Sequence, residues 1–425
     1  MSASVTVDAI RAAAERIRGG IIETPTIEAT SLSALFGQKI ALKLESLQRT
    51  GSFKERGALN KLTGLGRAER KAGVIACSAG NHAQSLAFHA QRLGIPATIV
   101  MPAETPFVKV VRTEAFGATI LLEGSDLSEA AEVADRRAAE RGLVLVHPYD
   151  DAEVICGQGT VALEMLAARP DLDLLMVPVG GGGLISGVAT AAKAINPATR
   201  IVGVQVETYD FMTRALAGET RLPSAGATLA EGIAVKRPGR LTQPIVAALV
   251  EEMVTVSEAM IEQAVGLLAD RQHLVAEGAG AAGIAALMTH AGRWRDRHIG
   301  IVLSGANIDQ RLLSSILLRE LVRRGQLVRL RAEISDQPGN LARLSQVIGA
   351  CAGNIVEIVH QRMFLDIPVK NTEVDFVLET RNEAHVAEIQ ARLAAAGFTT
   401  RLLSLAGRAG EEDKDDRHAA PNTRQ

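Results

Sequence analysis

The sequence predicts an α/β protein, a doubly wound and mainly parallel sheet, followed by a small ferredoxin-like βαββαβ domain. Up to about residue 325, short apolar runs alternate with alanine-rich helical stretches, and such runs are typical of strands buried on both faces. After residue 326 the pattern changes to amphipathic strands and helices. The chain has 425 residues, which is more than one core usually organises. These observations together predict more than one domain.

The strands expected in the first part are the apolar runs at 40–44, 73–77, 97–101, 118–122, 144–147, 174–179, 201–206 and 299–303. In open α/β sheets, ligands bind just beyond the carboxyl ends of the strands. Any polar or glycine-rich loop that directly follows one of these runs is therefore a candidate site.

The second part predicts strands at 327–334, 354–362, 373–379 and 399–405, with helices at 341–351 and 383–395. This order is that of a ferredoxin-like domain. We therefore expect a catalytic region over 1–325 and a small domain over 326–406. Residues 407–425 are charged and aperiodic, so we expect a disordered tail.

The composition excludes several classes of protein. A net charge of -2 and 3% aromatic residues argue against nucleic-acid binding. The three cysteines are widely spaced and form no disulfide framework or metal motif. The N-terminus lacks the features of a signal peptide, and no apolar run reaches the ~20 residues that span a bilayer. We therefore expect a cytoplasmic protein without nucleic-acid or membrane partners.

A lysine follows the first apolar run. The segment TGSFKERGA at 50–58 places Ser52 and Glu55 at the spacing of a capping box, which predicts a helix starting at Ser52. Lys54 would lie in its first turn, where the helix dipole disfavours the ammonium form. The neutral amine is the form that attacks an aldehyde. A solvated surface lysine is the alternative interpretation.

Two further loops present groups that can bind anions. The run at 74–77 leads into Ser78, Ala79, Gly80, Asn81 and His82, where a helix start can receive a carboxylate. His82 is either a structural histidine or a substrate contact.

The run at 174–179 leads into Gly180, Gly181, Gly182 and Gly183, followed by Leu184. Consecutive glycines let backbone N–H groups converge on one phosphate. Neither a nucleoside-triphosphate motif nor the GxGxxG register is present, so a phosphate monoester fits best and a tight turn is the alternative.

Ser304 follows the run at 301–303 and adds a neutral hydroxyl. An amine, a carboxylate cradle, a phosphate cradle and a hydroxyl at neighbouring strand ends are what pyridoxal 5'-phosphate and an amino acid require.

The sequence resembles the threonine dehydratase (threonine ammonia-lyase) family of fold-type-II pyridoxal-phosphate enzymes over residues 5–405. The matching motifs are SFKERGA at 52–58, SAGNHAQ at 78–84, PVGGGGL at 178–184, LAEGIAV at 229–235 and LSGANID at 303–309. The resemblance implies that Lys54 is the Schiff-base lysine and that Asn81 contacts the cofactor's 3-oxygen. It also implies that Gly180 to Leu184 hold the phosphate and that Ser304 faces the pyridine nitrogen.

The second domain resembles an ACT regulatory module. Its strand-to-helix loop carries Asp336, Gly339 and Asn340, with Asn340 expected as the helix N-cap. The resemblance implies a branched-chain amino-acid effector, a role in isoleucine biosynthesis, and a homo-oligomer, either a dimer or a tetramer.

The implied reaction converts L-threonine to 2-oxobutanoate and ammonia, and L-serine to pyruvate. Four alternatives are a serine dehydratase, a serine racemase, a 3-hydroxyaspartate dehydratase and a non-catalytic amino-acid sensor. Ala79 stands where a racemase needs a proton-carrying serine, and the intact Lys54 argues against a sensor. No extra cation for a second substrate carboxylate is evident near the loop. Glu207 has Thr213 where a second metal-binding carboxylate is expected, so we predict no metal.

Overall fold

The computed structural model describes residues 4–219, 226–361 and 370–403. It divides into two compact units, Met1–Asp309 and Gln310–Gln425. The division falls before residue 310 rather than near 325 because helix α14 (Gln310–Arg323) packs on strand β11 (Leu327–Ser335) of the second unit. The tail expected over 407–425 lies outside the described residues. Among the described helices, none combines the length and apolar character needed to cross a membrane.

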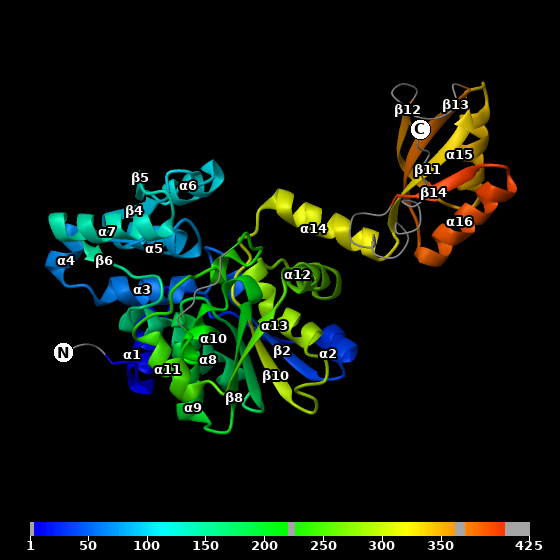
Figure 1. The fold of residues 1–425 in the computed structure, drawn as a ribbon. Helices are drawn as coiled ribbons and strands as arrows, with labels where there is room; N and C mark the ends of the chain where they lie inside the picture. Colours follow the sequence, from blue (N-terminus) through cyan, green and yellow to red (C-terminus); the bar gives the residue numbers. More distant parts are fainter. Residues whose placement is uncertain (1–3, 220–225, 362–369, 404–425) are drawn as a thin grey trace, which may run out of the picture. The chain divides into compact units, whose positions relative to one another are not determined.

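The first unit contains two sheets (Figure 1). Their strands are β1 (Thr26–Glu28), β2 (Lys39–Leu44), β3 (Val74–Cys77), β4 (Ala97–Met101), β5 (Thr119–Leu122), β6 (Val144–Leu145), β7 (Leu174–Pro178), β8 (Arg200–Val206), β9 (Glu252–Val256) and β10 (His298–Leu303). The larger sheet has the strand order β1-β2-β10-β7-β8-β9, and only β1 runs antiparallel to its neighbour. The smaller has the order β5-β4-β3-β6 and is parallel throughout.

Helices connect and cover these strands, and each sheet has its own buried apolar core. The α-helices are α1 (Val7–Ile17), α2 (Thr30–Phe36), α3 (Lys54–Gly64), α4 (Arg67–Ala72), α5 (Asn81–Leu93), α6 (Phe107–Glu114), α7 (Leu127–Arg141), α8 (Ala152–Ala168), α9 (Gly183–Ile195), α10 (Phe211–Leu216), α11 (Thr242–Leu249), α12 (Glu258–Gln272) and α13 (Gly278–Thr289). Short 3-10 turns are η1 (Glu45–Leu47), η2 (Glu207–Tyr209) and η3 (Glu231–Ile233).

The fold class predicted from the apolar runs is confirmed. Each predicted strand of the first unit is present, with ends that agree or differ by one or two residues. The sequence pattern did not reveal β1 and β9, which lie at the two edges of the larger sheet. Neither is a continuous buried run, because edge strands face solvent on one side.

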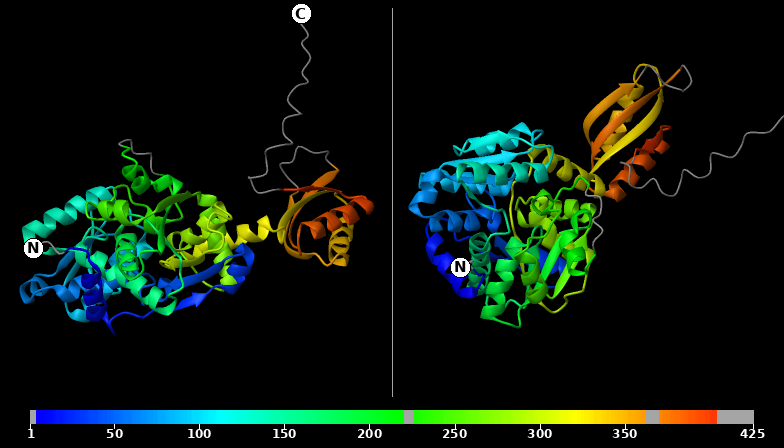
Figure 2. Two further views of the ribbon diagram at one scale, coloured as in Figure 1. Left: turned by 90° about the horizontal axis from the view of Figure 1, so that it is seen from below. Right: turned by 60° about the vertical axis from the view of Figure 1, so that its left-hand side comes forward.

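The second unit has the predicted βαββαβ order. Besides α14 and β11, its elements are α15 (Asn340–Ala350), β12 (Asn354–Gln361), β13 (Asn371–Glu379), α16 (Glu383–Ala395) and β14 (Thr399–Leu402). The strand order is β12-β13-β11-β14, with antiparallel pairing throughout. Helices α15 and α16 cover one face of the sheet (Figure 2). Alternate residues of β11 are buried against them, as expected for a sheet with one covered face.

The predicted capping box at the start of α3 is wrong. The helix begins at Lys54, its N-cap Phe53 makes no side-chain cap, and Ser52 Oγ is buried without a partner among the described residues. Glu55 instead points inward, where its carboxylate accepts the Thr50 amide and lies 3.2 Å from His89 Nε2. Lys54 is nevertheless in the first turn, as expected.

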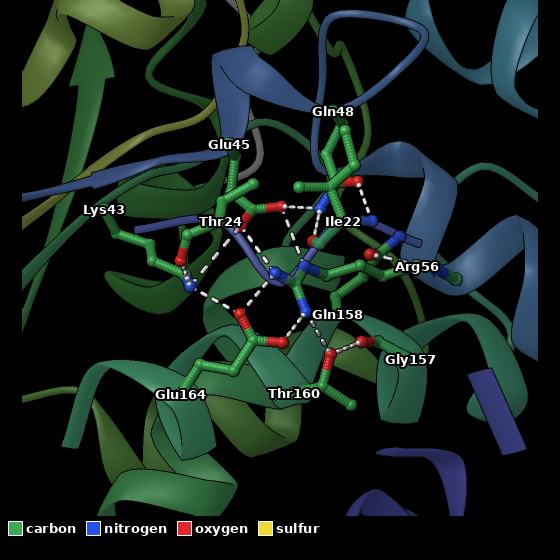
Figure 3. A network of polar contacts seen from close by, with 11 residues as sticks. Ile22, Thr24, Lys43, Glu45, Gln48, Arg56, Gly157, Gln158, Thr160 and Glu164 are labelled. Atoms are coloured by element: carbon green, nitrogen blue, oxygen red, sulfur yellow. Dashed lines mark hydrogen bonds and ion pairs between the residues drawn. The ribbon is translucent and has the colours of Figure 1, made fainter. Parts of the chain in front are cut away.

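A buried cluster of four charged side chains anchors this helix (Figure 3). Arg56 donates to Glu45 at 2.7 and 2.8 Å and to Glu164 at 2.5 and 2.7 Å. Lys43 also donates to Glu164, on α8. Arg56, Glu45 and Lys43 have no exposed side-chain surface. The cluster therefore contains two cations and two anions and ties β2, η1, α3 and α8 together.

The charges in this cluster depend on one another. Burial alone would raise the pKa of Glu45, but the charge and hydrogen bonds of Arg56 hold that pKa below its usual value. Burial and the neighbouring Arg56 lower the pKa of Lys43. Removing one member of such a cluster leaves an uncompensated buried charge.

We predict that Arg56→Met lowers the free energy of unfolding by about 3–5 kcal/mol, because Glu45 and Glu164 lose their main partner. Urea denaturation followed by fluorescence measures this, since the single tryptophan, Trp294, is buried in the first unit. The control is Arg11→Met, which removes an exposed ion pair with Asp8 and should change stability by less than about 1 kcal/mol. Equal, small losses in both variants would contradict the anchoring role.

Candidate active site

The predicted site residues converge because their strands are neighbours. Strands β2, β10 and β7 are adjacent and parallel, so the segments that follow them emerge at one edge of the sheet. These segments carry Lys54, Ser304 and the four glycines. The segment after β3 adds Asn81 from the smaller sheet.

Lys54 is half-buried, and its Nζ donates to Pro148 O at 2.7 Å. Burial lowers the pKa of Lys54 to about 8, although the charge of Glu277 acts in the opposite direction. The neutral amine is therefore more abundant near neutral pH than it is for an exposed lysine. That form can attack an aldehyde or accept a proton.

A backbone bridge brings Ser304 beside the lysine segment. Ser52 and Gly305 form an antiparallel bridge, and Phe53 N donates to Ser304 O at 3.1 Å. Ser304 is 2% exposed. The residues before Lys54 and after β10 are therefore fixed to each other, as a shared site requires.

Asn81 is the first residue of α5, and two neighbours fix its amide. Asn81 Nδ2 donates to Glu277 Oε1 at 2.8 Å, and its Oδ1 accepts from Asn307 Nδ2 at 2.7 Å. Asn307 also donates to Thr50 O at 2.7 Å. The second N–H of Asn81 is thereby oriented by the protein before any ligand is considered.

Glu277 is a site residue that the sequence analysis missed. It precedes α13, is 9% exposed, and its backbone N donates to Gly305 O at 3.0 Å. Burial raises the pKa of Glu277 to about 7, against the hydrogen bond from Asn81. Glu277 does not follow a predicted strand, unlike Lys54, Asn81 and Ser304. The local sequence pattern therefore gave no reason to place it in the site.

The loop before α5 and its histidine have different surroundings. Ser78, Ala79 and Gly80 are half-buried at the start of the helix, and Gly80 N donates to Ser78 Oγ at 3.2 Å. His82 is buried and its Nε2 lies 2.9 Å from Val146 O. Burial and the charge of Lys54 lower the pKa of His82 to about 3, so the ring is neutral. This geometry favours the structural interpretation of His82.

The four glycines are required by protein packing as well as by any phosphate. A Cβ on Gly181 would lie 2.3 Å from the Tyr149 ring, and one on Gly183 would lie 2.9 Å from Tyr149 Cβ. Gly182 has a φ of +95°, which favours glycine. The loop then opens α9, and Leu184 lies in the first turn of that helix.

The site fits an aldehyde-bearing phosphate monoester. The first N–H groups of α9 lack intrahelical partners, as at any helix start, and favour an anion. The buried Ser52 Oγ has no protein partner in the described part of the chain and suits a polar ligand atom. Within that part, no group of three or more His, Cys, Asp or Glu side chains is arranged to hold a metal ion.

A second candidate site lies in the C-terminal unit. A pocket of about 270 Å³ is lined by Ile334, Ser335, Asp336, Gln337, Pro338, Gly339, Leu341 and His360. The expectation that Asn340 caps α15 is wrong: Gly339 is the N-cap, with φ +93°. Asn340 is the first helical residue and donates to Ser335 O and Oγ at 3.1 and 2.7 Å.

Known proteins are similar to this chain over most of its length. Residues 17–305 match the family model "Pyridoxal-phosphate dependent enzyme". An L-threonine ammonia-lyase from Thermotoga maritima is 42% identical over 400 residues, which cover 94% of this chain and 100% of the relative. A tomato (Solanum lycopersicum) threonine deaminase structure has a TM-score of 0.68 and 35% identity, covering 74% of this chain and 95% of that one. A maize serine racemase structure has a TM-score of 0.70 and 36% identity, and the match covers 76% of this chain and 99% of the racemase chain.

The pKa of Glu277 predicts a pH-dependent loss of stability in the cofactor-free protein. In the folded state Glu277 keeps its proton up to about pH 7, whereas an unfolded glutamate loses it near pH 4.5. Stability contributed by the protonated form is therefore present below pH 4.5 and is lost as pH rises toward 7, by up to about 3 kcal/mol. Glu277→Gln should remove this loss.

Urea denaturation between pH 4.5 and 7, followed by Trp294 fluorescence, measures the effect. The control is Glu104→Gln, which replaces an exposed glutamate and should retain the wild-type pH dependence. The interpretation fails if wild type and Glu277→Gln have the same slope of stability against pH.

Proposed function

Because the chain belongs to the pyridoxal-phosphate-dependent enzyme family, we propose that it is an L-threonine ammonia-lyase, which converts L-threonine to 2-oxobutanoate and ammonia. The observation that carries the proposal is the half-buried amine of Lys54, with its pKa lowered to about 8, beside the Asn81 and Ser304 loops. The Thermotoga maritima relative, which matches along its whole length, supports threonine as the substrate.

Four parts of the chain would hold the cofactor. Lys54 would bind its aldehyde, and the N–H groups from Gly180 to Leu184 would bind its phosphate. Ser304 would face the ring nitrogen and Asn81 would donate to the ring hydroxyl oxygen. When bound, pyridoxal phosphate withdraws electrons from the α-carbon of an attached amino acid and weakens the bonds there.

The residues around the substrate would supply orientation and proton transfer. The start of α5, with Ser78, Ala79, Gly80, Asn81 and His82, would receive the substrate carboxylate through its backbone N–H groups. His82 would contribute its backbone N–H at the start of α5 rather than a charged imidazole. Lys54, neutral in part at neutral pH, would take the α-proton.

Ser304 offers a hydroxyl rather than a carboxylate, so no anion stands there to hold a proton on a ring nitrogen. This choice favours loss of the β-hydroxyl over transamination. L-Serine, which also carries a β-hydroxyl, would give pyruvate by the same route.

Similarity to the maize serine racemase makes racemisation the second candidate. A racemase needs a proton carrier on each face of the substrate α-carbon. Ala79 has no group that can carry a proton, so we infer that elimination dominates. Chiral chromatography of serine incubations distinguishes the two: D-serine forming as fast as pyruvate would favour the racemase.

The cellular location, the pathway, the oligomeric state and the effector are proposed from the sequence. We propose a cytoplasmic enzyme of isoleucine biosynthesis that works as a homo-oligomer, and we propose that its C-terminal pocket takes a branched-chain amino acid. Ile334, Pro338 and Leu341 line that pocket and suit an apolar side chain, while Asp336 can meet an ammonium group. The start of α15 offers N–H groups to a carboxylate.

We predict that Lys54→Ala lowers kcat for threonine by at least about 100-fold, because the general base is lost. The variant should also lose the visible absorbance of cofactor bound to the protein through its aldehyde. A coupled oxo-acid assay and absorbance spectra measure both effects, and Lys71→Ala, an exposed lysine on α4, is the control. Turnover by Lys54→Ala within about tenfold of wild type would refute the assignment.

We predict that isoleucine shifts the half-saturating threonine concentration of the full-length enzyme by about 5- to 150-fold, the range of typical coupling energies. Asp336→Asn should reduce this shift, because the ammonium partner in the pocket is neutralised. Glu333→Gln is a matched control, since Glu333 lies on β11, three residues before Asp336, and is outside the pocket-lining set. The effector site lies elsewhere if Asp336→Asn responds to isoleucine as wild type does.

A further inference from the structure

The glycine loop is held from behind by helix α11. Gly181 O accepts two hydrogen bonds, from Thr242 Oγ1 at 2.6 Å and from Gly239 N at 3.2 Å. Thr242 is the first residue of α11 and has no exposed surface. Its hydroxyl also accepts from Gly239 N at 3.1 Å. The hydroxyl has a single proton, and Gly181 O is its nearest acceptor, since Gly239 O is 3.3 Å away.

This contact sets the direction of the loop's N–H groups. In a trans peptide unit the carbonyl and the following N–H point in opposite directions. With its carbonyl directed at Thr242, the Gly181–Gly182 peptide turns the N–H of Gly182 away from α11. Thr242 therefore sets the direction of the Gly182 N–H, which lies at the start of α9 where an anion would bind. Thr242 does this through the Gly181 carbonyl and not through a contact with the anion.

Asp150 holds Thr242 in place. Its Oδ1 accepts from Leu241 N at 2.8 Å and its Oδ2 from Arg240 N at 2.9 Å. These are backbone N–H groups at the entry to α11, where helix N–H groups lack intrahelical partners. A Cβ on Gly239 would lie 2.4 Å from Asp150 Oδ1, so the carboxylate also lies against the residue that precedes Arg240.

The same short stretch also contacts the lysine. Pro148 O accepts from Lys54 Nζ at 2.7 Å, Tyr149 packs against Gly181 and Gly183, and Asp150 holds the entry to α11. Pro148, Tyr149 and Asp150 are consecutive. One tripeptide therefore sets the lysine amine and the glycine loop relative to each other.

We propose that Thr242 and Asp150 are positioning residues for the cofactor phosphate: Thr242 orients the Gly181 carbonyl, and Asp150 fixes Thr242. This inference rests on the phosphate role proposed for the glycine loop. It assigns neither residue a contact with the cofactor. If the inference holds, replacing Thr242 or Asp150 weakens the binding of the cofactor phosphate and leaves the binding of the cofactor aldehyde to Lys54 unchanged.

The test compares pyridoxal phosphate with pyridoxal, which lacks the phosphate. Dissociation constants are measured by titrating the cofactor-free, full-length protein, and the ³¹P chemical shift of the bound phosphate is recorded. Thr242→Val should weaken pyridoxal phosphate binding by about 2- to 12-fold, the effect of losing one of the two hydrogen bonds that Gly181 O accepts. Pyridoxal binding should stay the same, the ³¹P signal should move, and Thr242→Ser should restore the wild-type values.

Thr199→Val is the matched control, because Thr199 is similarly buried and its hydroxyl donates to a distant carbonyl, Leu172 O, at 3.4 Å. It should bind both compounds as wild type does. Should Thr242→Val fail to fold, Asp150→Asn decides: it keeps the shape and removes the charge, and a selective loss of pyridoxal phosphate binding is expected.

Unchanged pyridoxal phosphate binding in the folded variant, or equal loss of both compounds, overturns the inference. The proposed activity is judged separately, by threonine turnover in wild type and by Lys54→Ala. If wild type itself binds the two compounds equally, the phosphate role of the glycine loop fails, and this inference fails with it.

Discussion

The position of Lys54 depends on a buried charge cluster two residues further along the chain. Arg56 joins Glu45, directly after β2, to Glu164 on α8. The cluster fixes the first turn of α3 from inside. Close packing of α3 against α8 also holds this first turn, because a Cβ on Gly57 would lie 2.7 Å from Val154 O of α8. The Lys54 amine can face the open edge of the sheet because its helix is held by side chains that are fully or largely buried.

The residues at strand ends could be predicted from the sequence, and the residues that support them could not. Lys54, Asn81 and Ser304 follow apolar runs, so parallel sheet geometry alone brings them to one edge. Glu277 and Thr242 follow no such run into the site, and their roles depend on contacts between distant segments, with Asn81 and with Gly181. The capping-box prediction failed for a related reason, because burial of Glu55 overrode its local spacing from Ser52. Local patterns specify positions along an element, whereas buried polar partners are specified by the packing of the whole unit.

The glycine loop satisfies two requirements at once. The sequence suggested a phosphate as the reason for four glycines, but Tyr149, Thr242 and Val235 already occupy the space that side chains at these positions would need. A substitution there would therefore disturb packing whether or not a phosphate binds. Evidence about the phosphate is better sought in Thr242, whose hydroxyl can be removed with little change in volume.

The pairing of β2 with β10 has a consequence for how the protein is made. Strand β2 lies near the start of the chain and its parallel partner β10 near the end of the first unit. During synthesis β2 can pair with β1 on one side, while its other edge stays open until β10 has left the ribosome. Open strand edges invite pairing with other chains, and such long-range contacts form slowly. The bridge between Ser52 and Gly305 closes at the same late stage, so a nascent chain that lacks β10 has Lys54 but not the assembled candidate site.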